Sequence, residues 1–351
     1  MEQPLLRDAG FYAMIGTGLI VLLGIPFFFD MFTVMQLTQY VVLSVFALSL
    51  GYIWGFGGIL SFGQAAFFGL GSYTFAVCSI STGNTTVALV LAFVIPSLLG
   101  IALGYFMFYG RLSDVYLGVM TMVVALILWK LANHTAGPEY SLFGVRLGGF
   151  NGIPSIPTIH FPGRPDEMLD PSQLFQFFMA ILIIVYVGLR LLIASDFGRI
   201  SIGIRENETR ASLLGYDVRL HKVVVFTIGS GIAGLAGAMW ATYQAFIDPN
   251  VFSMEMSAKA LVWVMAGGLG TLVGPILGVT LLQWLTLQLG AVTWLNSIAV
   301  QGAIMMALVL VLPKGLVPSI NAFAKSGWAF WRRRGQAGVV AKSAAGQKVV
   351  R

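Results

Sequence analysis

The chain has 351 residues, of which 58% are hydrophobic and only 10% are charged, and its net charge is +6. Soluble domains carry roughly 25% charged residues. This composition, with a mean hydropathy of +0.87, therefore excludes a soluble protein and predicts an integral membrane protein. The basic excess does not predict a nucleic-acid partner, because the positions of Lys and Arg in a membrane protein report its orientation.

Six apolar runs of about 20 residues, the length that crosses a bilayer core ~30 Å thick, precede position 195. Each run therefore predicts one crossing. The first run lacks a small-residue cleavage site after it, so we interpret it as a retained span. Alternating segments of about ten residues, which would indicate a β-barrel, do not occur. The six predicted spans are 10–29, 34–53, 57–79, 86–109, 115–135 and 173–194.

Glycines crowd the junction of the second and third predicted spans, in GYIWGFGGILSFGQAAFFGLGSY. Glycine lets helices approach closely, and several glycines together can also break a helix and free polar backbone groups. We favour close packing here, and the alternative is a broken helix that lines a translocation path. Under that alternative the candidate pathway residues are Ser61, Gln64, Phe67 and Tyr73.

Charged side chains are almost absent from the predicted spans. Lys130 and His134 lie a turn apart near the outer end of the fifth span, where a lysine ammonium can reach the lipid headgroups. We therefore interpret them as an interfacial anchor rather than a substrate site. Cys78 is the single cysteine, so a disulfide within the chain and a cysteine-based metal site are both excluded. We expect it to serve in packing.

Two segments between the sixth span and its neighbours are polar. The stretch 136–172 is rich in Gly and Pro, which predicts an external loop that caps the outer mouth. The interval 195–221 interleaves apolar residues with charges of both signs. This pattern predicts one or two short amphipathic helices along the cytoplasmic surface, with Gly215 as the helix C-cap. We interpret the interval as a docking surface for a soluble partner, and a helix resting on anionic lipid is the alternative.

Four shorter or interrupted apolar runs follow the charged interval. If that interval is cytoplasmic, six preceding crossings place the N terminus inside, and a cytoplasmic tail requires an even number of later crossings. We therefore expect about ten transmembrane helices in all, some broken or re-entrant. The four later runs are 222–247, 258–270, 272–290 and 295–312.

Orientation follows from the basic residues. With ten crossings, only Lys130, Arg146, Arg164 and Lys259 face outward, as the positive-inside rule expects. The run 258–270 is short for a span, so it either crosses or re-enters as a half-helix. Joining it with 272–290 into one tilted helix would give three later crossings and an external tail, so ten crossings are preferred.

A second glycine cluster, AGGLGTLVGPILG, lies in this part of the chain. The four-residue spacing of Gly270, Gly274 and Gly278 predicts that they share one helix face. Pro275 within the cluster predicts a kink. The glycines expected to serve in helix packing are Gly57, Gly58, Gly267, Gly268, Gly270, Gly274 and Gly278.

The domain organisation is simple. We expect one transmembrane domain over 1–320 and a basic, disordered cytoplasmic tail over 321–351. Signatures of an enzyme are absent, because the chain has no G-x-x-x-x-G-K-[ST], H-E-x-x-H or G-x-S-x-G motif and its three histidines are far apart. We therefore expect no catalytic residues and no metal site. The alternative of an intramembrane enzyme fails, because the sequence offers no set of catalytic residues that could come together in one site. If the protein uses ATP, another chain binds it.

Three stretches carry a resemblance to a known family: ILSFGQAAFFGLGSYTFA, then GRISIGIRENETRASLLGYDVRLHKVVVFTIGSGIAGLAGAMWA, and then VMAGGLGTLVGPILG. GGFNGIPSIP in the outer loop adds to it. Together they span about residues 50 to 280 in the family's order. The chain resembles inner-membrane permeases of ATP-binding cassette importers for branched-chain amino acids, the LivM-like group, which also includes permeases for urea and short amides.

The resemblance implies an all-α, type II importer-like permease in the bacterial inner membrane, with both termini cytoplasmic. It implies one half of a pore, with a homologous second permease, two ATP-binding cassette ATPase subunits, an extracytoplasmic solute-binding protein and membrane lipid as partners. The permease would bind no cofactor, because ATP and Mg are used by the ATPase subunits. Alternating access would import branched-chain amino acids, or alternatively urea or short amides. The near absence of intramembrane carboxylates argues against a more distant alternative, an ion-coupled secondary transporter or a channel.

The resemblance also implies that the stretch from Arg205 to Gly215 is the coupling element, which sits in a cleft of the ATPase. The general importer pattern has Glu-Ala-Ala followed by Gly. Here Thr209 and Arg210 stand where Glu and the first Ala would be, whereas Ala211 and Gly215 are retained. The expected ATPase-coupling residues are Arg205, Glu206, Glu208, Arg210, Ala211 and Gly215.

Overall fold

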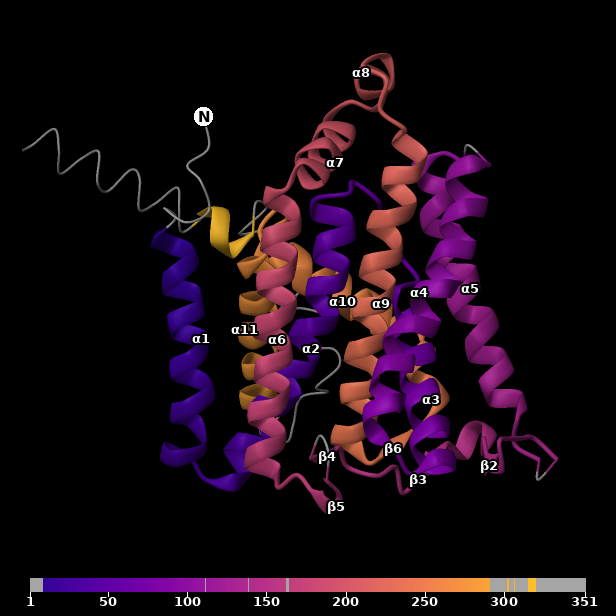
Figure 1. The fold of residues 1–351 in the computed structure, drawn as a ribbon, viewed down its shortest axis with the longest axis vertical. Coiled ribbons are helices and arrows are strands. Elements are labelled where there is room, and N and C mark those ends of the chain that lie inside the picture. Colours follow the sequence, from indigo (N-terminus) through magenta and orange to yellow (C-terminus); the bar gives the residue numbers. More distant parts are fainter. Residues whose placement is uncertain are drawn as a thin grey trace, which may run out of the picture.

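The computed structural model describes residues 9–110, 112–137, 139–161, 164–290, 302, 306 and 315–319. Within them, seven helices are long and apolar enough to cross a membrane, and they stand side by side as a bundle (Figure 1). The all-α, polytopic prediction is confirmed. The seven helices are α1 (Ala9–Phe28), α2 (Met31–Gly55), α3 (Gln64–Thr82), α4 (Thr85–Tyr109), α5 (Asp114–His134), α6 (Pro171–Ala194) and α9 (Val218–Gln244).

Polar caps set where several of these helices begin. Asp30 accepts hydrogen bonds from the backbone N–H and the hydroxyl of Thr33 at the start of α2, and these bonds hold the pKa of Asp30 below its usual range. Asn84 caps α4 and Asp217 caps α9 in the same way. Such caps satisfy backbone donors that have no partner within the helix.

The third helix begins later than its apolar run. The run 57–79 predicts helix from its start, but α3 begins at Gln64, and residues 56–63 form a non-helical α2–α3 linker. The hydroxyl of Thr121 on α5 accepts the N–H groups of Phe62 and Gly63 at 3.1 and 3.3 Å. Irregular backbone at membrane depth is tolerated when protein groups satisfy it. The first part of the apolar run is therefore not helical, and it is also closely packed. That it lines a translocation path stays a prediction.

The outer-loop sequence folds into short elements at one end of the bundle (Figure 1). Strands β1 and β2 form one antiparallel pair, β4 and β5 another, and β3 pairs with β6, which follows α9. We call this end the strand end and the opposite end, where α7 and α8 lie, the charged end. The short elements are β1 (Ser141–Leu142), β2 (Val145–Arg146), η2 (Gly149–Asn151), β3 (Ile153–Pro154), β4 (His160–Phe161), β5 (Arg164–Met168) and β6 (Phe246–Ile247).

The chain after β6 returns through the bundle in a broken path. It forms η3 (Pro249–Phe252), then α10 (Met254–Gly267), and then α11 (Val273–Gly290). Ile247 pairs with Ile153 at the strand end. Beyond α10, a Cβ atom built on Gly55, the last residue of α2, would lie 2.9 Å from the backbone nitrogen of Gly270. The ends of segment 245–270 thus lie at opposite ends of the bundle, and α10, which holds most of the expected run 258–270, forms the part nearer the charged end.

Two expectations about the second glycine cluster are wrong. Gly270 does not share a helix face with Gly274 and Gly278, because it lies in the turn before α11 with φ of +76°. Pro275 stands in the first turn of α11, where a missing N–H breaks no helical hydrogen bond and no kink follows. The expected run 295–312 lies outside the described residues apart from 302 and 306, as does the tail 321–351.

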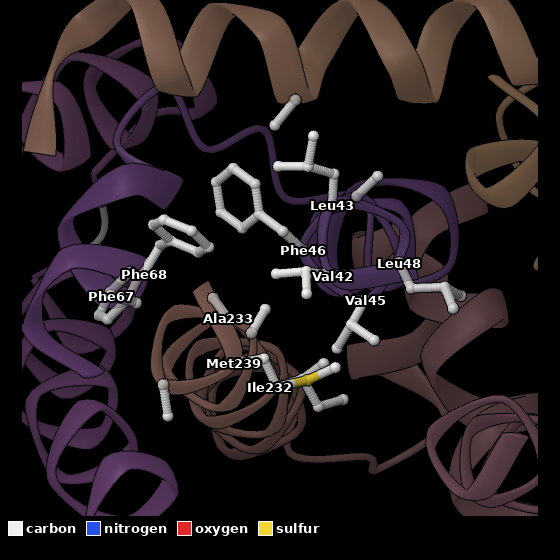
Figure 2. Packing of buried hydrophobic residues seen from close by; sticks show 14 of the residues in the cluster. Val42, Leu43, Val45, Phe46, Leu48, Phe67, Phe68, Ile232, Ala233 and Met239 are labelled. Carbon is white, nitrogen blue, oxygen red and sulfur yellow. The ribbon is translucent and has the colours of Figure 1, made fainter. Parts of the chain in front are cut away.

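The core surrounds α9, which packs against α2, α3 and α4. Figure 2 shows Phe46 of α2 facing Phe68 of α3, with their ring centroids 4.5 Å apart, and Ala233 and Met239 of α9 beside them. Close approach of α3 and α9 depends on glycine, since a Cβ atom at Gly237 would lie 1.9 Å from the carbonyl oxygen of Phe68. Small residues at such contacts are typical of membrane helix packing.

Candidate coupling site and central polar cluster

The charged segment, residues 195–221, forms two short helices at the charged end of the bundle (Figure 1). They are α7 (Asp196–Glu206) and α8 (Glu208–Leu213). Asn207 ends α7, and its side-chain oxygen also accepts the N–H of Arg210 at 2.8 Å, which caps α8. One residue therefore sets the corner between the two helices.

Gly215 ends α8 as the sequence predicts. Its φ is +90°, a conformation that glycine adopts at little cost. The N–H of Gly215 bonds the carbonyl of Ser212 at 3.0 Å, and the N–H of Tyr216 bonds the carbonyl of Ala211 at 3.3 Å. These two bonds are the Schellman arrangement. The expected coupling residue Ala211 is buried, so it packs the corner rather than offering a surface.

Arg205, expected as an ATPase contact, turns toward the bundle. Its Nη1 atom donates a hydrogen bond to the carbonyl oxygen of Gly55, and its Nη2 atom bonds Glu206. The aliphatic part of its side chain lies against Gly58, where an added Cβ atom would approach Arg205 Cγ to 2.7 Å. Arg205 therefore attaches α7 to the end of α2.

Glu208 also bonds to the bundle. Its carboxylate forms an ion pair with Lys222 in the first turns of α9, and the Lys222 side chain is only 9% exposed. The ammonium of Lys222 lies 5.8 Å from the centroid of the Phe108 ring, a favourable cation–π distance. The charged segment is thus held at two points, by Arg205 on α7 and by Glu208 on α8. Sequence reasoning did not single out Lys222.

The outermost part of the charged segment is apolar. Leu213 is 82% exposed and Leu214 is 72% exposed, and α8 is the part farthest from the strand end (Figure 1). The sequence predicted one or two short amphipathic helices in this interval, and α8 is one of the two that form; it projects away from the bundle (Figure 1). We call Leu213 and Leu214 the apolar tip. Arg210 and Glu206 are exposed nearby.

The expected pathway residues do not form one site. Gln64 begins α3 and is completely buried, and its amide nitrogen donates to Ser49 Oγ at 3.0 Å and to the carbonyl of Gly229 at 3.4 Å. The N–H of Ala65 donates to Ser257 Oγ of α10 at 3.1 Å. The N-terminal ends of α3 and α10 therefore meet inside the bundle, in what we call the central polar cluster: Ser49, Gln64, Thr121 and Ser257.

Ser61, Phe67 and Tyr73 have different surroundings. Ser61 is completely buried in the α2–α3 linker, and its hydroxyl has no hydrogen-bond partner among the described residues. Phe67 packs edge-on against Phe226 of α9, with centroids 5.4 Å apart, and belongs to the core. Tyr73 stacks on Phe252 of η3 and lines a cavity of about 540 Å³.

This cavity lies between α3, α4, α5 and the β1–β2 loop. Its wall is mostly apolar, and the exceptions are the hydroxyl side chains of Thr74, Ser81, Thr82 and Thr135 beside that of Tyr73. Cys78 packs against the hydrophobic core, as expected. The cavity is large enough for the side chain of an amino acid, whereas Ser61 and Gln64 lie in packed surroundings outside its lining.

A bundle of apolar helices that carries an attached, partly exposed helical corner outside its spans is the fold of a polytopic membrane protein. The chain belongs to the family described as branched-chain amino acid transport system permease component, whose model matches residues 32–311. It is a transport subunit of the ATP-binding cassette type, in a family that works with ATPase and substrate-binding partners.

Several curated proteins are similar to the chain. The high-affinity branched-chain amino acid transport system permease protein LivM of Escherichia coli strain K12 is 28% identical over 323 residues, covering 86% of this chain and 73% of that protein. The probable branched-chain amino acid transport permease protein LivM of Methanocaldococcus jannaschii is 24% identical over 268 residues, covering 67% and 74%. The autoinducer 2 import system permease protein LsrC of an Enterobacter species is 31% identical over 106 residues, covering 28% and 31%. No solved structure is significantly similar to the chain.

Proposed function

We propose that this chain is one permease subunit of an ATP-driven importer of branched-chain amino acids in the bacterial inner membrane. The charged segment lies on the cytoplasmic side, as do both termini. A homologous second permease completes the pore, two ATPase subunits bind ATP and Mg, and an extracytoplasmic protein delivers the solute. Transport proceeds by alternating access of the two permease subunits.

The observation that carries this proposal is the apolar tip. Leu213 and Leu214 project into an aqueous region on a helix whose base is fixed by Arg205 and Glu208. Burying one leucine side chain is worth about 1.5–3 kcal/mol. A pair of exposed leucines on an attached corner therefore supports docking into an apolar cleft of a soluble ATPase, where the flanking Glu206 and Arg210 would add charge complementarity.

The substrate class rests on the family and on the cavity. The relatives that match most of the chain are named for branched-chain amino acid transport. The mostly apolar wall around Tyr73 suits an aliphatic side chain better than urea or a short amide, which would need polar partners. Residue-level contacts with substrate at Ser61, Gln64, Phe67 and Tyr73 stay predictions.

The transport proposal is tested with proteoliposomes. The permease pair, the ATPases and the binding protein are reconstituted, and uptake of labelled leucine is measured with ATP inside and in competition with isoleucine, valine, urea and acetamide. We expect ATP-dependent uptake that the two amino acids compete for and the amides do not. Competition by urea would show that the importer carries urea or short amides instead. Uphill uptake by the permease pair alone would indicate an ion-coupled carrier.

The docking role is tested by Leu213→Asp. Placing a carboxylate in the proposed apolar cleft should cost about 2 kcal/mol, roughly 30-fold in affinity, so much less ATPase should co-purify. Leu142→Asp is the matched control, because Leu142 is an exposed leucine at the strand end. Equal co-purification of ATPase with Leu213→Asp and Leu142→Asp would show that the apolar tip is not the docking site.

A further inference from the structure

One side chain of the charged segment lies beside three glycines of the bundle. Arg205 bonds the carbonyl of Gly55 at the end of α2, and its stem lies against Gly58 in the α2–α3 linker. A Cβ atom built on Gly270, in the turn between α10 and α11, would lie 3.7 Å from Arg205 Nη1. Arg205 is therefore the meeting point of α7 with both glycine clusters of the chain.

The contact with Gly55 has a clear physical basis. The last four carbonyl groups of a helix lack an N–H partner within that helix. A guanidinium at the end of α2 satisfies one of them and also interacts favourably with the negative end of the helix dipole. The glycines make room for this arrangement, because side chains at Gly55 and Gly58 would clash with Gly270 and Arg205.

The parts that Arg205 contacts lead to the centre of the bundle. The α2–α3 linker starts beside Arg205 and ends at Gln64 in the central polar cluster. Helix α10 starts in that cluster near Ser257 and ends just before Gly270. Two of the segments that join the charged end to the meeting point of α3 and α10 therefore reach the charged end beside this one arginine.

We propose that Arg205 is a positioning residue that couples displacement of α7 to the α2–α3 linker and to α10. This inference rests on the proposed function, because it assumes that the ATPases move the charged segment. A packed bundle responds to a small displacement by moving between discrete arrangements. Arg205 transmits the displacement from inside the permease, whereas the apolar tip receives it from the ATPase.

The discriminating measurement is the amount of leucine transported per ATP hydrolysed. Arg205→Met keeps the aliphatic stem against Gly58 and removes the donors to Gly55. We expect ATPase to co-purify with this variant at the wild-type level and binding-protein-stimulated ATP hydrolysis to persist. Transport per ATP should fall about tenfold, which corresponds to a coupling free energy of about 1.4 kcal/mol. Arg205→Lys retains one donor and should recover part of the coupling.

Arg199→Met is the matched control on the same helix. Within the described part of the chain Arg199 forms an ion pair with Asp196, and both side chains are more than half exposed, so its loss should leave transport per ATP unchanged. Gly58→Ala displaces the Arg205 stem from the other side. On its own it should also lower transport per ATP, because the displaced stem draws the guanidinium away from the carbonyl of Gly55.

The outcomes separate this inference from the function on which it rests. If the wild-type assembly shows no ATP-dependent uptake, the proposed function fails. If the wild type is active and Arg205→Met lowers only the yield or thermal stability, with normal transport per ATP, Arg205 is a structural cap and the positioning role is wrong. A loss of ATPase co-purification in Arg205→Met would also overturn it, by making Arg205 part of the docking surface.

Discussion

Glycine sets the distance between the two helices at the centre of the bundle. Between α3 and α9 the backbones touch, because Gly237 faces the carbonyl of Phe68 and Gly71 faces the backbone of Gly234. Without a hydrophobic driving force between helices in lipid, such close van der Waals contact stabilises their association. The contact permits no methyl group at these positions.

Gly237→Ala should therefore destabilise the protein. The added Cβ atom would lie 1.9 Å from the Phe68 carbonyl oxygen, and overpacking of this kind costs typically about 1–3 kcal/mol. The expected result is a lower apparent melting temperature in detergent. Gly188→Ala in α6 is the control, since a Cβ atom there meets nothing within 4 Å, and it should leave stability unchanged or slightly raised. Equal effects of the two changes would contradict the packing argument.

At the scale of elements, apolar run length predicted most of the spans because a bilayer requires about 20 helical residues. The same criterion failed where the chain is apolar but not helical. Residues 57–63 are apolar but not helical, and two of their backbone N–H groups, those of Phe62 and Gly63, are satisfied by Thr121, which is far away in sequence. The density of glycines indicated a break in the helix. The sequence does not show which hydroxyl group accepts the backbone N–H groups that such a break leaves without a helical partner.

The candidate coupling site likewise combines features that a local sequence pattern predicts with features that depend on tertiary packing. Gly215 was predictable because a helix C-cap is a local pattern. The inward direction of Arg205 and the Glu208–Lys222 pair depend on how α7 and α8 pack on α2 and α9, which no local pattern specifies. The alternation of apolar and charged residues predicted the short helices, but it did not specify that the corner at Asn207 points α8 outward with Leu213 exposed.

Thr121→Val should disrupt the α2–α3 linker. Valine has the shape of threonine but accepts no hydrogen bond, so the N–H groups of Phe62 and Gly63 would lose their partner, and each buried unsatisfied group costs about 1–3 kcal/mol. We expect reduced thermal stability and reduced leucine uptake. Thr121→Ser keeps the hydroxyl and should preserve both properties to a large extent. Wild-type stability of Thr121→Val would show that the hydroxyl does not hold the linker.

At the scale of the whole molecule, the two ends of the bundle have different characters. The strand end carries the short strand pairs, whose β1–β2 loop lines the cavity beside Tyr73, and the charged end carries the apolar tip. The proposed function requires that these ends face opposite sides of the membrane. The path of segment 245–270 is consistent with this, because it returns the chain from the strand end to the charged end before α11.

Thiol labelling tests this orientation directly, because Cys78 is the single cysteine. In a Cys78→Ser background, Leu142→Cys and Leu213→Cys place one exposed thiol at the strand end and one on the apolar tip. A membrane-impermeant maleimide should label the first in spheroplasts and the second only in inverted membrane vesicles. Labelling of both thiols from the same side would contradict the proposed topology. Protection of Leu213→Cys when the ATPase is bound would in addition place the apolar tip in the interface.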